Sequence, residues 1–262
     1  MLSQESIARI EASNRWRTDR VEAFDLPDGR VIVKGQRKPR GRLRFALLSL
    51  VACLTRNPLL KAVPAPGGAA AQATEIRRLR ALGDAGVRVP QVIHVGKNYF
   101  VMTRIEGNQL GAQFSASSLG GVEAVGRGLE AIGQLHAQGQ YLSQAFARNI
   151  LDWEDQLWFV DFEDDPLEVM DLHDAQARDL LAFILSAFWS AKPQTDQLMA
   201  VWCKAIERMS PAVIARVRQA SSGLLWLRYL PSQRRPWGRD VVTVQAMASF
   251  LKLWNLQELG AD

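Results

Sequence analysis

The stretch that decides the fold runs from residue 135 to residue 163 and reads LHAQGQYLSQAFARNILDWEDQLWFVDFE. Two short apolar segments, 150–151 and 157–160, lie on either side of Glu154-Asp155, a pattern typical of a β-hairpin. Just before this stretch, apolar residues recur every three or four positions from residue 122 to residue 135, which predicts a long amphipathic helix. The stretch therefore joins a helix to a hairpin through a polar loop.

The open end of this hairpin carries the sharpest geometric hypothesis in the sequence. If the chain reverses at residue 155, Asn149 faces Asp161 across the hairpin. An amide oxygen and a carboxylate are hard ligands that suit Mg²⁺, which takes its other ligands from water and from a phosphate-bearing substrate. From the residues alone, an ordinary cross-strand hydrogen bond between the two side chains is the simpler alternative.

Strand patterns crowd the part of the chain that precedes this region, and helical patterns dominate after residue 179. The expected strands, in two pairs each joined by a tight turn, cover residues 21–24, 31–34, 87–95 and 99–102. Strands followed by helices indicate an α+β fold. We expect two lobes, a strand-rich N-lobe of residues 1–106 and a helical C-lobe of residues 107–262.

A helix is predicted over residues 69–82, with one face made of Ala71, Glu75, Leu79 and Leu82. Glu75 is the only charged member of that face. A buried carboxylate is costly unless a cation pairs with it, so this position asks for a Lys or Arg from elsewhere in the chain. The alternative is that Glu75 lies at the edge of the face and reaches water.

The net charge of +5 on 262 residues is the small difference between large, separated blocks. Nine basic residues and no acidic ones lie between Gly29 and Thr74, and eleven acidic residues against one arginine lie between Asp152 and Asp179. Each run taken alone fits a solvated face. A carboxylate cluster beside two strands is also a common way to hold a divalent cation.

Several classes of protein are excluded or disfavoured by simple counts. The two cysteines, Cys53 and Cys203, have neither metal-ligand nor disulfide-framework spacing. The polar N-terminus does not resemble a signal peptide. The longest apolar run covers residues 45–54, whereas a transmembrane helix needs about 20 residues. We expect no transmembrane segment and a cytoplasmic location, with peripheral association at the inner face of the membrane left open.

Three segments together resemble the catalytic and metal-binding loops of the protein-kinase-like fold, and most resemble those of small bacterial lipopolysaccharide kinases and RIO-like enzymes. These segments are Leu135-His136-Ala137-Gln138-Gly139, Asn149-Ile150-Leu151 and Phe159-Val160-Asp161-Phe162-Glu163. The resemblance covers about residues 15–190 and implies ATP and Mg²⁺ as cofactors. It implies that Asn149 and Asp161 bind the metal.

The same resemblance assigns roles to residues outside these loops. Lys34, in Val31-Ile32-Val33-Lys34, would hold the nucleotide phosphates, and Glu75 would pair with Lys34. Arg104 and Glu106 fall where the hinge and the adenine contact are expected. Asp179 resembles the aspartate that opens the central helix of the C-lobe and braces the catalytic loop.

The chain departs from the family pattern at two places. Gln144 stands where the catalytic loop usually carries an aspartate that orients the attacking hydroxyl or accepts its proton. Residues 10–24 contain no glycine, so the usual glycine-rich cradle over the phosphates is absent or built differently. The interval between Lys34 and Glu75 is also expanded by a basic insert, residues 37–66.

The insert supplies a second functional lead. Basic residues from Arg37 to Arg44 precede an apolar helix predicted within residues 41–55, an arrangement that suits an anionic lipid or a lipopolysaccharide-like substrate. A helix docked on the N-lobe with a solvated basic rim is the alternative. An aromatic and basic stretch near the C-terminus, residues 226–239, reads as a C-lobe surface, and no nucleic-acid partner is expected.

The function that the resemblance implies is an ATP-dependent phosphotransferase acting on an envelope saccharide or a lipid-linked acceptor. Gln144 would position the acceptor, and Glu163, Asp164 or Asp165 would supply a displaced base. A pseudokinase, which keeps the fold as a nucleotide-binding or regulatory module at the membrane surface, is the alternative. A basic adaptor without a nucleotide site is the third hypothesis.

Overall fold

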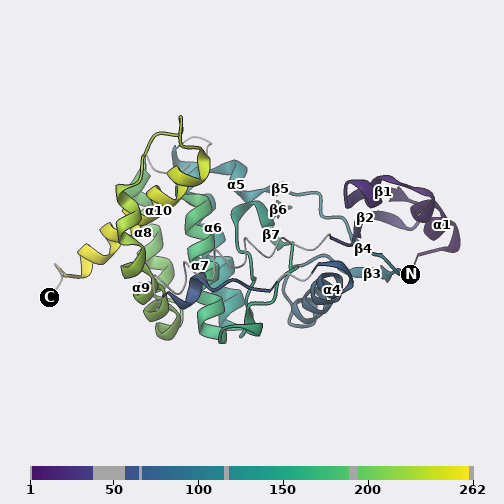
Figure 1. Ribbon diagram of the computed structural model, residues 1–262, viewed down its shortest axis with the longest axis horizontal. Helices are drawn as coiled ribbons and strands as arrows, with labels where there is room; N and C mark the ends of the chain where they lie inside the picture. The colour runs from purple at the N-terminus through teal and green to yellow at the C-terminus, as the bar shows by residue number, and fades with distance from the viewer. Residues whose placement is uncertain (1, 38–56, 65–66, 115–117, 189–193, 260–262) are drawn as a thin grey trace.

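The computed structural model describes residues 2–37, 57–64, 67–114, 118–188 and 194–259. The fold is mixed α+β, with a small antiparallel sheet formed by N-terminal strands and a larger helical C-terminal part. These two parts lie at opposite ends of the long axis, and a short second sheet lies between them (Figure 1). The expected α+β class is confirmed, and the division at residues 106 and 107 stays a prediction.

The first sheet has the strand order β1-β2-β4-β3, and every neighbouring pair is antiparallel. Its strands are β1 (Val21–Leu26), β2 (Gly29–Gly35), β3 (Val92–Val95) and β4 (Tyr99–Thr103). The predicted hairpin of β1 and β2 is confirmed. The third strand begins later than residue 87, because Pro90 has no N–H to donate to a ladder.

The alternation of side chains along β2 places Lys34 against the rest of the molecule. Val31 and Val33 are buried on the outer face of the sheet, under the short N-terminal helices α1 (Gln4–Ala12) and α2 (Arg15–Thr18). Lys34 points to the other face, where α4 (Gly68–Asp84) packs. The predicted helix of residues 69–82 is confirmed as the main part of α4.

The second sheet has the order β5-β6-β7 and contains the predicted hairpin. Its strands are β5 (Asn108–Gln109), β6 (Ile150–Trp153) and β7 (Gln156–Phe159). The register of the hairpin differs by one residue from the predicted register. Glu154 and Asp155 form a two-residue turn with positive φ at both positions, so Trp153 pairs with Gln156.

This register corrects the predicted pairing of Asn149 with Asp161. Asn149 lies opposite Val160 instead, and the Val160 N–H donates to the Asn149 carbonyl oxygen at 2.9 Å. Asp161 follows with a φ of +73°, in the left-handed region that aspartate tolerates better than most residues. A tight turn has two central residues rather than one, which accounts for the one-residue difference.

The C-terminal part is built from helices around a continuous apolar core. The helices are α5 (Leu110–Gln113), α6 (Ser118–Ala137), α7 (Leu172–Ala187), α8 (Thr195–Ile206), α9 (Pro211–Leu224) and α10 (Arg239–Leu259). Short 3₁₀ segments among the described residues accompany them: η1 (Pro58–Leu60), η2 (Ala147–Asn149), η3 (Pro166–Glu168) and η5 (Leu225–Tyr229). The core includes Trp202 and Trp254, and it extends to Leu79 and Leu82 of α4. Helix α4 and the helical C-terminal part therefore share one packed interior.

Two predictions concern membrane contact. None of the helices that the structure describes is long and apolar enough to cross a membrane. The predicted helix of residues 41–55, and the basic residues from Lys38 to Arg44, lie outside the described residues. Of the basic run that opens the insert, only Arg37 is described.

Candidate functional site

Lys34 is the centre of a buried charged cluster. Its Nζ lies 2.6 Å from Glu75 Oε1, 2.9 Å from Asp161 Oδ1 and 3.1 Å from Glu163 Oε1. Lys34 is 6% exposed, and Glu75 is buried as well. The expectation that Glu75 pairs with a cation from elsewhere in the chain is confirmed, and Lys34 is that cation.

The three carboxylates of this cluster stabilise the charge of Lys34. Burial lowers the pKa of Lys34, but the charges of Glu75, Asp161 and Glu163 outweigh burial and raise it above the ordinary value. Burial, together with the charges of Asp161 and Glu163, raises the pKa of Glu75 above its ordinary value, although the contact with Lys34 favours the charged form. A buried lysine with three carboxylates around it therefore stays protonated at neutral pH.

Glu163, a predicted candidate for the displaced base, is a member of this cluster, and its pairing with three cations was not predicted. Its carboxylate is 4% exposed and accepts hydrogen bonds from Arg20 and, at 2.7 Å, from Arg37 Nη1. Burial raises its pKa, but Lys34 and the two arginines outweigh that effect and hold the pKa well below its usual range. Glu163 is therefore committed to three cations. The basic character of the segment that carries Arg37 was the only sequence signal for it.

The loop that carries Gln144 is held by hydrogen bonds in which at most one of the two partners is charged. Gln144 Nε2 donates to Asp164 Oδ2 at 2.9 Å, and Asn149 Nδ2 donates to the Gln144 carbonyl oxygen at 3.0 Å. The structure thus places Asp164 beside Gln144, whereas Glu163 and Asp165 have other partners. Among the three predicted candidates for a displaced base, Asp164 is the one in contact with Gln144.

Asp179 braces this loop from inside a helix. It is fully buried, its Oδ2 accepts the Leu142 N–H at 2.6 Å, and the same atom lies 3.2 Å from His136 Nε2. The predicted position at the start of the central helix is wrong, because α7 begins at Leu172 with Asp171 as its N-cap. The Asp171 side chain accepts the Asp174 N–H there, which is why the helix starts seven residues before Asp179.

The helix that carries Glu75 is tied to both functional loops by residues that sequence reasoning missed. Arg78 is buried, donates to the Tyr141 carbonyl oxygen at 2.6 Å, and stacks 3.7 Å from the centre of the Tyr141 ring. The Tyr141 hydroxyl and Arg77 both donate to Asp165, at 2.6 and 2.8 Å. Arg78 follows Glu75 by three positions, so helical spacing places both on adjoining parts of one face, and this was the available signal.

Arg104 and Glu106 lie in the connector between β4 and β5, where the resemblance places a hinge. Arg30 Nη1 lies 2.6 Å from Glu106 Oε2, and Arg104 Nη1 lies 3.7 Å from Asp25 Oδ1. These ion pairs join the connector to the β1–β2 hairpin. Within the described ranges, neither side chain contacts Lys34, Glu75 or Asp161.

The predicted metal ligands are only partly assembled. The Asp161 side chain is 35% exposed, so its carboxylate reaches both Lys34 and solvent. Asn149 is buried, and its amide nitrogen is already bound to the loop. Among the residues that the structure describes, no group of three or more His, Cys, Asp or Glu side chains is arranged to hold a metal. An Mg²⁺ site made of Asn149 and Asp161 stays a prediction.

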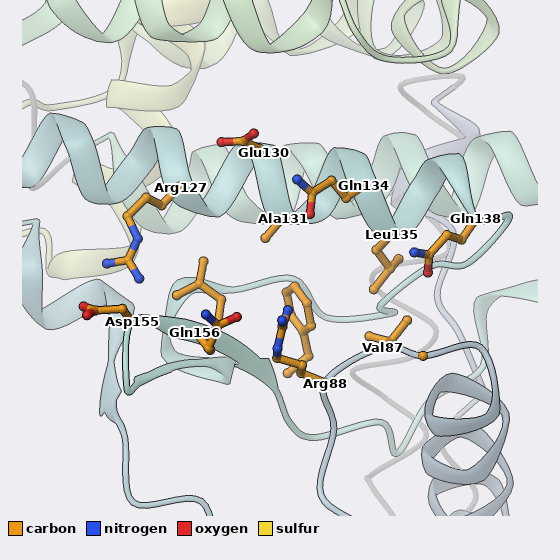
Figure 2. A pocket seen from close by; sticks show the side chains of 13 residues that line it. Val87, Arg88, Arg127, Glu130, Ala131, Gln134, Leu135, Gln138, Asp155 and Gln156 are labelled. Atoms are coloured by element: carbon orange, nitrogen blue, oxygen red, sulfur yellow. The ribbon is translucent and has the colours of Figure 1, made fainter.

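A separate cavity of about 220 Å³ lies between α6, the turn of the β6–β7 hairpin and the segment before β3. Figure 2 shows Arg127 of α6 extending toward Asp155 of the turn, with Gln156 at the start of β7 beside it. Its lining contains positively and negatively charged side chains, but none of the residues of the Lys34 cluster. This cavity is therefore distinct from the predicted site.

No protein-family model matches the chain, and no curated protein matches its sequence. The functional conclusion therefore depends on geometry: a buried lysine bridges a helix glutamate and the aspartate that follows the β6–β7 hairpin.

Proposed function

We propose that the protein is an ATP-dependent phosphotransferase of protein-kinase-like fold, acting on an envelope saccharide or a lipid-linked acceptor. The observation that carries this proposal is the position of Lys34 Nζ, 2.6 Å from Glu75 and 2.9 Å from Asp161. These three residues come from β2, α4 and the segment after β7. A phosphotransferase of this type needs such a lysine for the phosphates, a glutamate that fixes it and an aspartate for the metal.

The residues of the cluster divide the chemistry between them. Glu75 holds Lys34 in place, and Lys34 supplies positive charge to the nucleotide phosphates. The partly exposed carboxylate of Asp161, together with the amide oxygen of Asn149, supplies the hard oxygen ligands that Mg²⁺ prefers. The bound cation would neutralise charge that develops on the transferred phosphoryl group.

The acceptor side of the site relies on Gln144 and Asp164. Gln144 would hold the acceptor hydroxyl by a hydrogen bond, since an amide positions a group without taking its proton. The acceptor oxygen then bonds to the γ-phosphorus of ATP, and the bond between that phosphorus and the bridging oxygen breaks, so that ADP leaves. The proton of the acceptor hydroxyl passes to Asp164. Phosphoryl transfer depends mainly on positioning and electrostatics, so an amide at position 144 is compatible with turnover.

A pseudokinase is the second candidate, and one observation favours it. Gln144 is hydrogen-bonded to Asp164 at 2.9 Å, so the nearest carboxylate to the catalytic position is engaged by the amide itself. In this form the protein binds nucleotide and regulates a partner without transferring phosphate. Both candidates include an anionic lipid or lipopolysaccharide-like partner at the Arg37–Arg44 insert and a cytoplasmic, membrane-peripheral location.

Nucleotide binding is the first test. Mg·ATP should raise the melting temperature of the parent protein, and Lys34→Ala and Asp161→Asn should abolish that increase. Lys97→Ala and Asp84→Asn are matched controls, because both are exposed and lie outside the cluster. A parent protein whose melting temperature does not respond to Mg·ATP contradicts both candidate functions.

Turnover separates the two candidates. The parent protein, γ-labelled ATP and a panel of envelope saccharides and lipid-linked saccharides should yield a labelled acceptor that Lys34→Ala does not produce. Binding of Mg·ATP without any labelled acceptor supports the pseudokinase instead.

A further inference from the structure

Three cations surround one buried carboxylate in a chain that has no glycine between residues 10 and 24. Arg20 lies between α2 and β1, Lys34 lies in β2, and Arg37 follows β2. All three contact Glu163, the second residue after Asp161. These cations therefore converge beside the site where the proposed function requires phosphates to bind.

The backbone brings Arg20 to this position through a close approach at Gly35. The Gly35 N–H donates to the Arg20 carbonyl oxygen at 2.7 Å. A Cβ at position 35 would lie 2.8 Å from the carbonyl oxygen of Trp16, closer than real contacts allow. Glycine at the end of β2 thus lets the α2–β1 segment pack against the strand that carries Lys34.

The two arginines are more open to solvent than the carboxylate that they bind. The Arg20 side chain is 28% exposed and the Arg37 side chain is 34% exposed, whereas the Glu163 side chain is 4% exposed. The Arg20 Nε has no hydrogen-bond partner among the described residues. An anion that arrives from solvent therefore meets the guanidinium groups before it meets Glu163.

The charges of the whole cluster cancel. Arg20, Lys34 and Arg37 contribute three positive charges, and Glu75, Asp161 and Glu163 contribute three negative ones. Glu75 serves to fix Lys34, and Asp161 is the proposed metal ligand. Glu163 has neither role, and it is the carboxylate that all three cations share.

We propose that Arg20, Lys34 and Arg37 form the phosphate-binding cradle of this protein in place of a glycine-rich loop. Glu163 occupies the cradle until a polyphosphate displaces it. Guanidinium groups bind phosphate oxygens in the same two-pronged geometry with which they bind carboxylates, so one anion can replace the other. The assignment of a nucleotide to this cradle rests on the proposed function, whereas the binding of polyphosphate does not.

Calorimetric titration of the full-length protein tests the cradle. The ligands are adenosine, AMP, ADP and ATP, each with Mg²⁺, and inorganic tripolyphosphate. Arg20→Gln and Arg37→Gln should each weaken Mg·ATP and tripolyphosphate binding about tenfold or more, the loss expected for one charge-assisted hydrogen bond, and should leave adenosine unaffected. Arg20→Lys and Arg37→Lys should recover part of the affinity, and Arg15→Gln, on the exposed face of α2, is the matched control.

The direction in which Glu163→Gln changes the affinity for phosphate decides whether Glu163 competes with it. If Glu163 competes with phosphate, this variant should bind Mg·ATP and tripolyphosphate more tightly than the parent, by about tenfold. A glutamate that only supports the local structure would weaken binding when replaced. Tighter binding by Glu163→Gln supports the cradle, and unchanged or weaker binding overturns the displacement by phosphate.

The outcomes for the cradle and for the proposed function can be told apart. If the parent binds Mg·ATP and the arginine variants bind it equally well, the cradle is wrong and the proposed function stands. If the parent binds tripolyphosphate through the arginines but no nucleotide, the cradle stands and the nucleotide function fails. A parent that binds neither ligand overturns both.

Discussion

The Lys34 cluster and the Gln144 loop hold their side chains with different chemistry. Lys34 and five other charged groups pair with one another, with Lys34, Glu75 and Glu163 buried at the centre. Around Gln144, an amide donates to Asp164, a second amide donates to a carbonyl oxygen, and Asp179 accepts a backbone N–H. The first region is the proposed phosphate cradle, and in the second region amide groups hold the loop in position. The proposed binding of a nucleotide and the proposed transfer of its phosphate depend on different regions, so substitutions can test them separately.

Lys34→Met removes the centre of the first region and should give the largest change. The substitution leaves Glu75 buried beside two further carboxylates with no lysine, and breaking a buried ion pair of this kind costs about 3–5 kcal/mol. We expect a loss of that size in the free energy of unfolding, measured by urea denaturation without ligand. The control Lys97→Met should change it little, and an equal effect of the two variants would show that the cluster is not a coupled unit.

Gln144→Asp converts the second region toward the pattern of the protein-kinase-like enzymes that the sequence resembles. An aspartate at this position would restore a proton acceptor, and general-base catalysis contributes about 10²–10⁴-fold to a rate. If the protein is a slow phosphotransferase, the initial rate of labelled-acceptor formation should rise within that range. A rate that stays at the level of the parent, in a variant that still binds Mg·ATP, would mean that the loop is not the limiting feature.

Asp165→Asn tests the link between the two regions and should give the smallest change. Burial raises the pKa of Asp165, but hydrogen bonds from Tyr141, Arg77 and the Leu167 N–H outweigh it and lower the pKa below the ordinary 3.8. A lowered pKa means that the ionised group stabilises the fold above pH 3.8 and that this contribution disappears as the pH falls below it. The parent should exceed Asp165→Asn by about 1 kcal/mol at pH 7 and lose that advantage on acidification, as followed by denaturant unfolding across pH. A difference that does not vary with pH would exclude the charge of Asp165 as the cause.

The features that could be predicted were the ones with a local signal. The β1–β2 hairpin follows from alternating apolar residues around Pro27-Asp28, and the β6–β7 hairpin follows in the same way from the residues around Glu154-Asp155. Glu75 was recognisable because one charged residue on an apolar helical face requires a partner. The one-residue error in the Asn149 pairing arose because turn length, not strand composition, decides the register of a hairpin.

Sequence by itself determined the α+β class, the helix that carries Glu75, and the hairpin that precedes Asp161, because each depends on periodicity or turn chemistry within a few residues. Only the tertiary structure decided that Glu163 lies among Arg20, Lys34 and Arg37, and that Gln144 meets Asp164. Those contacts join residues as far as 143 positions apart. Their partners are chosen by which charged groups are desolvated together when the sheet, α4 and the loops pack, and no local pattern in the chain encodes that choice.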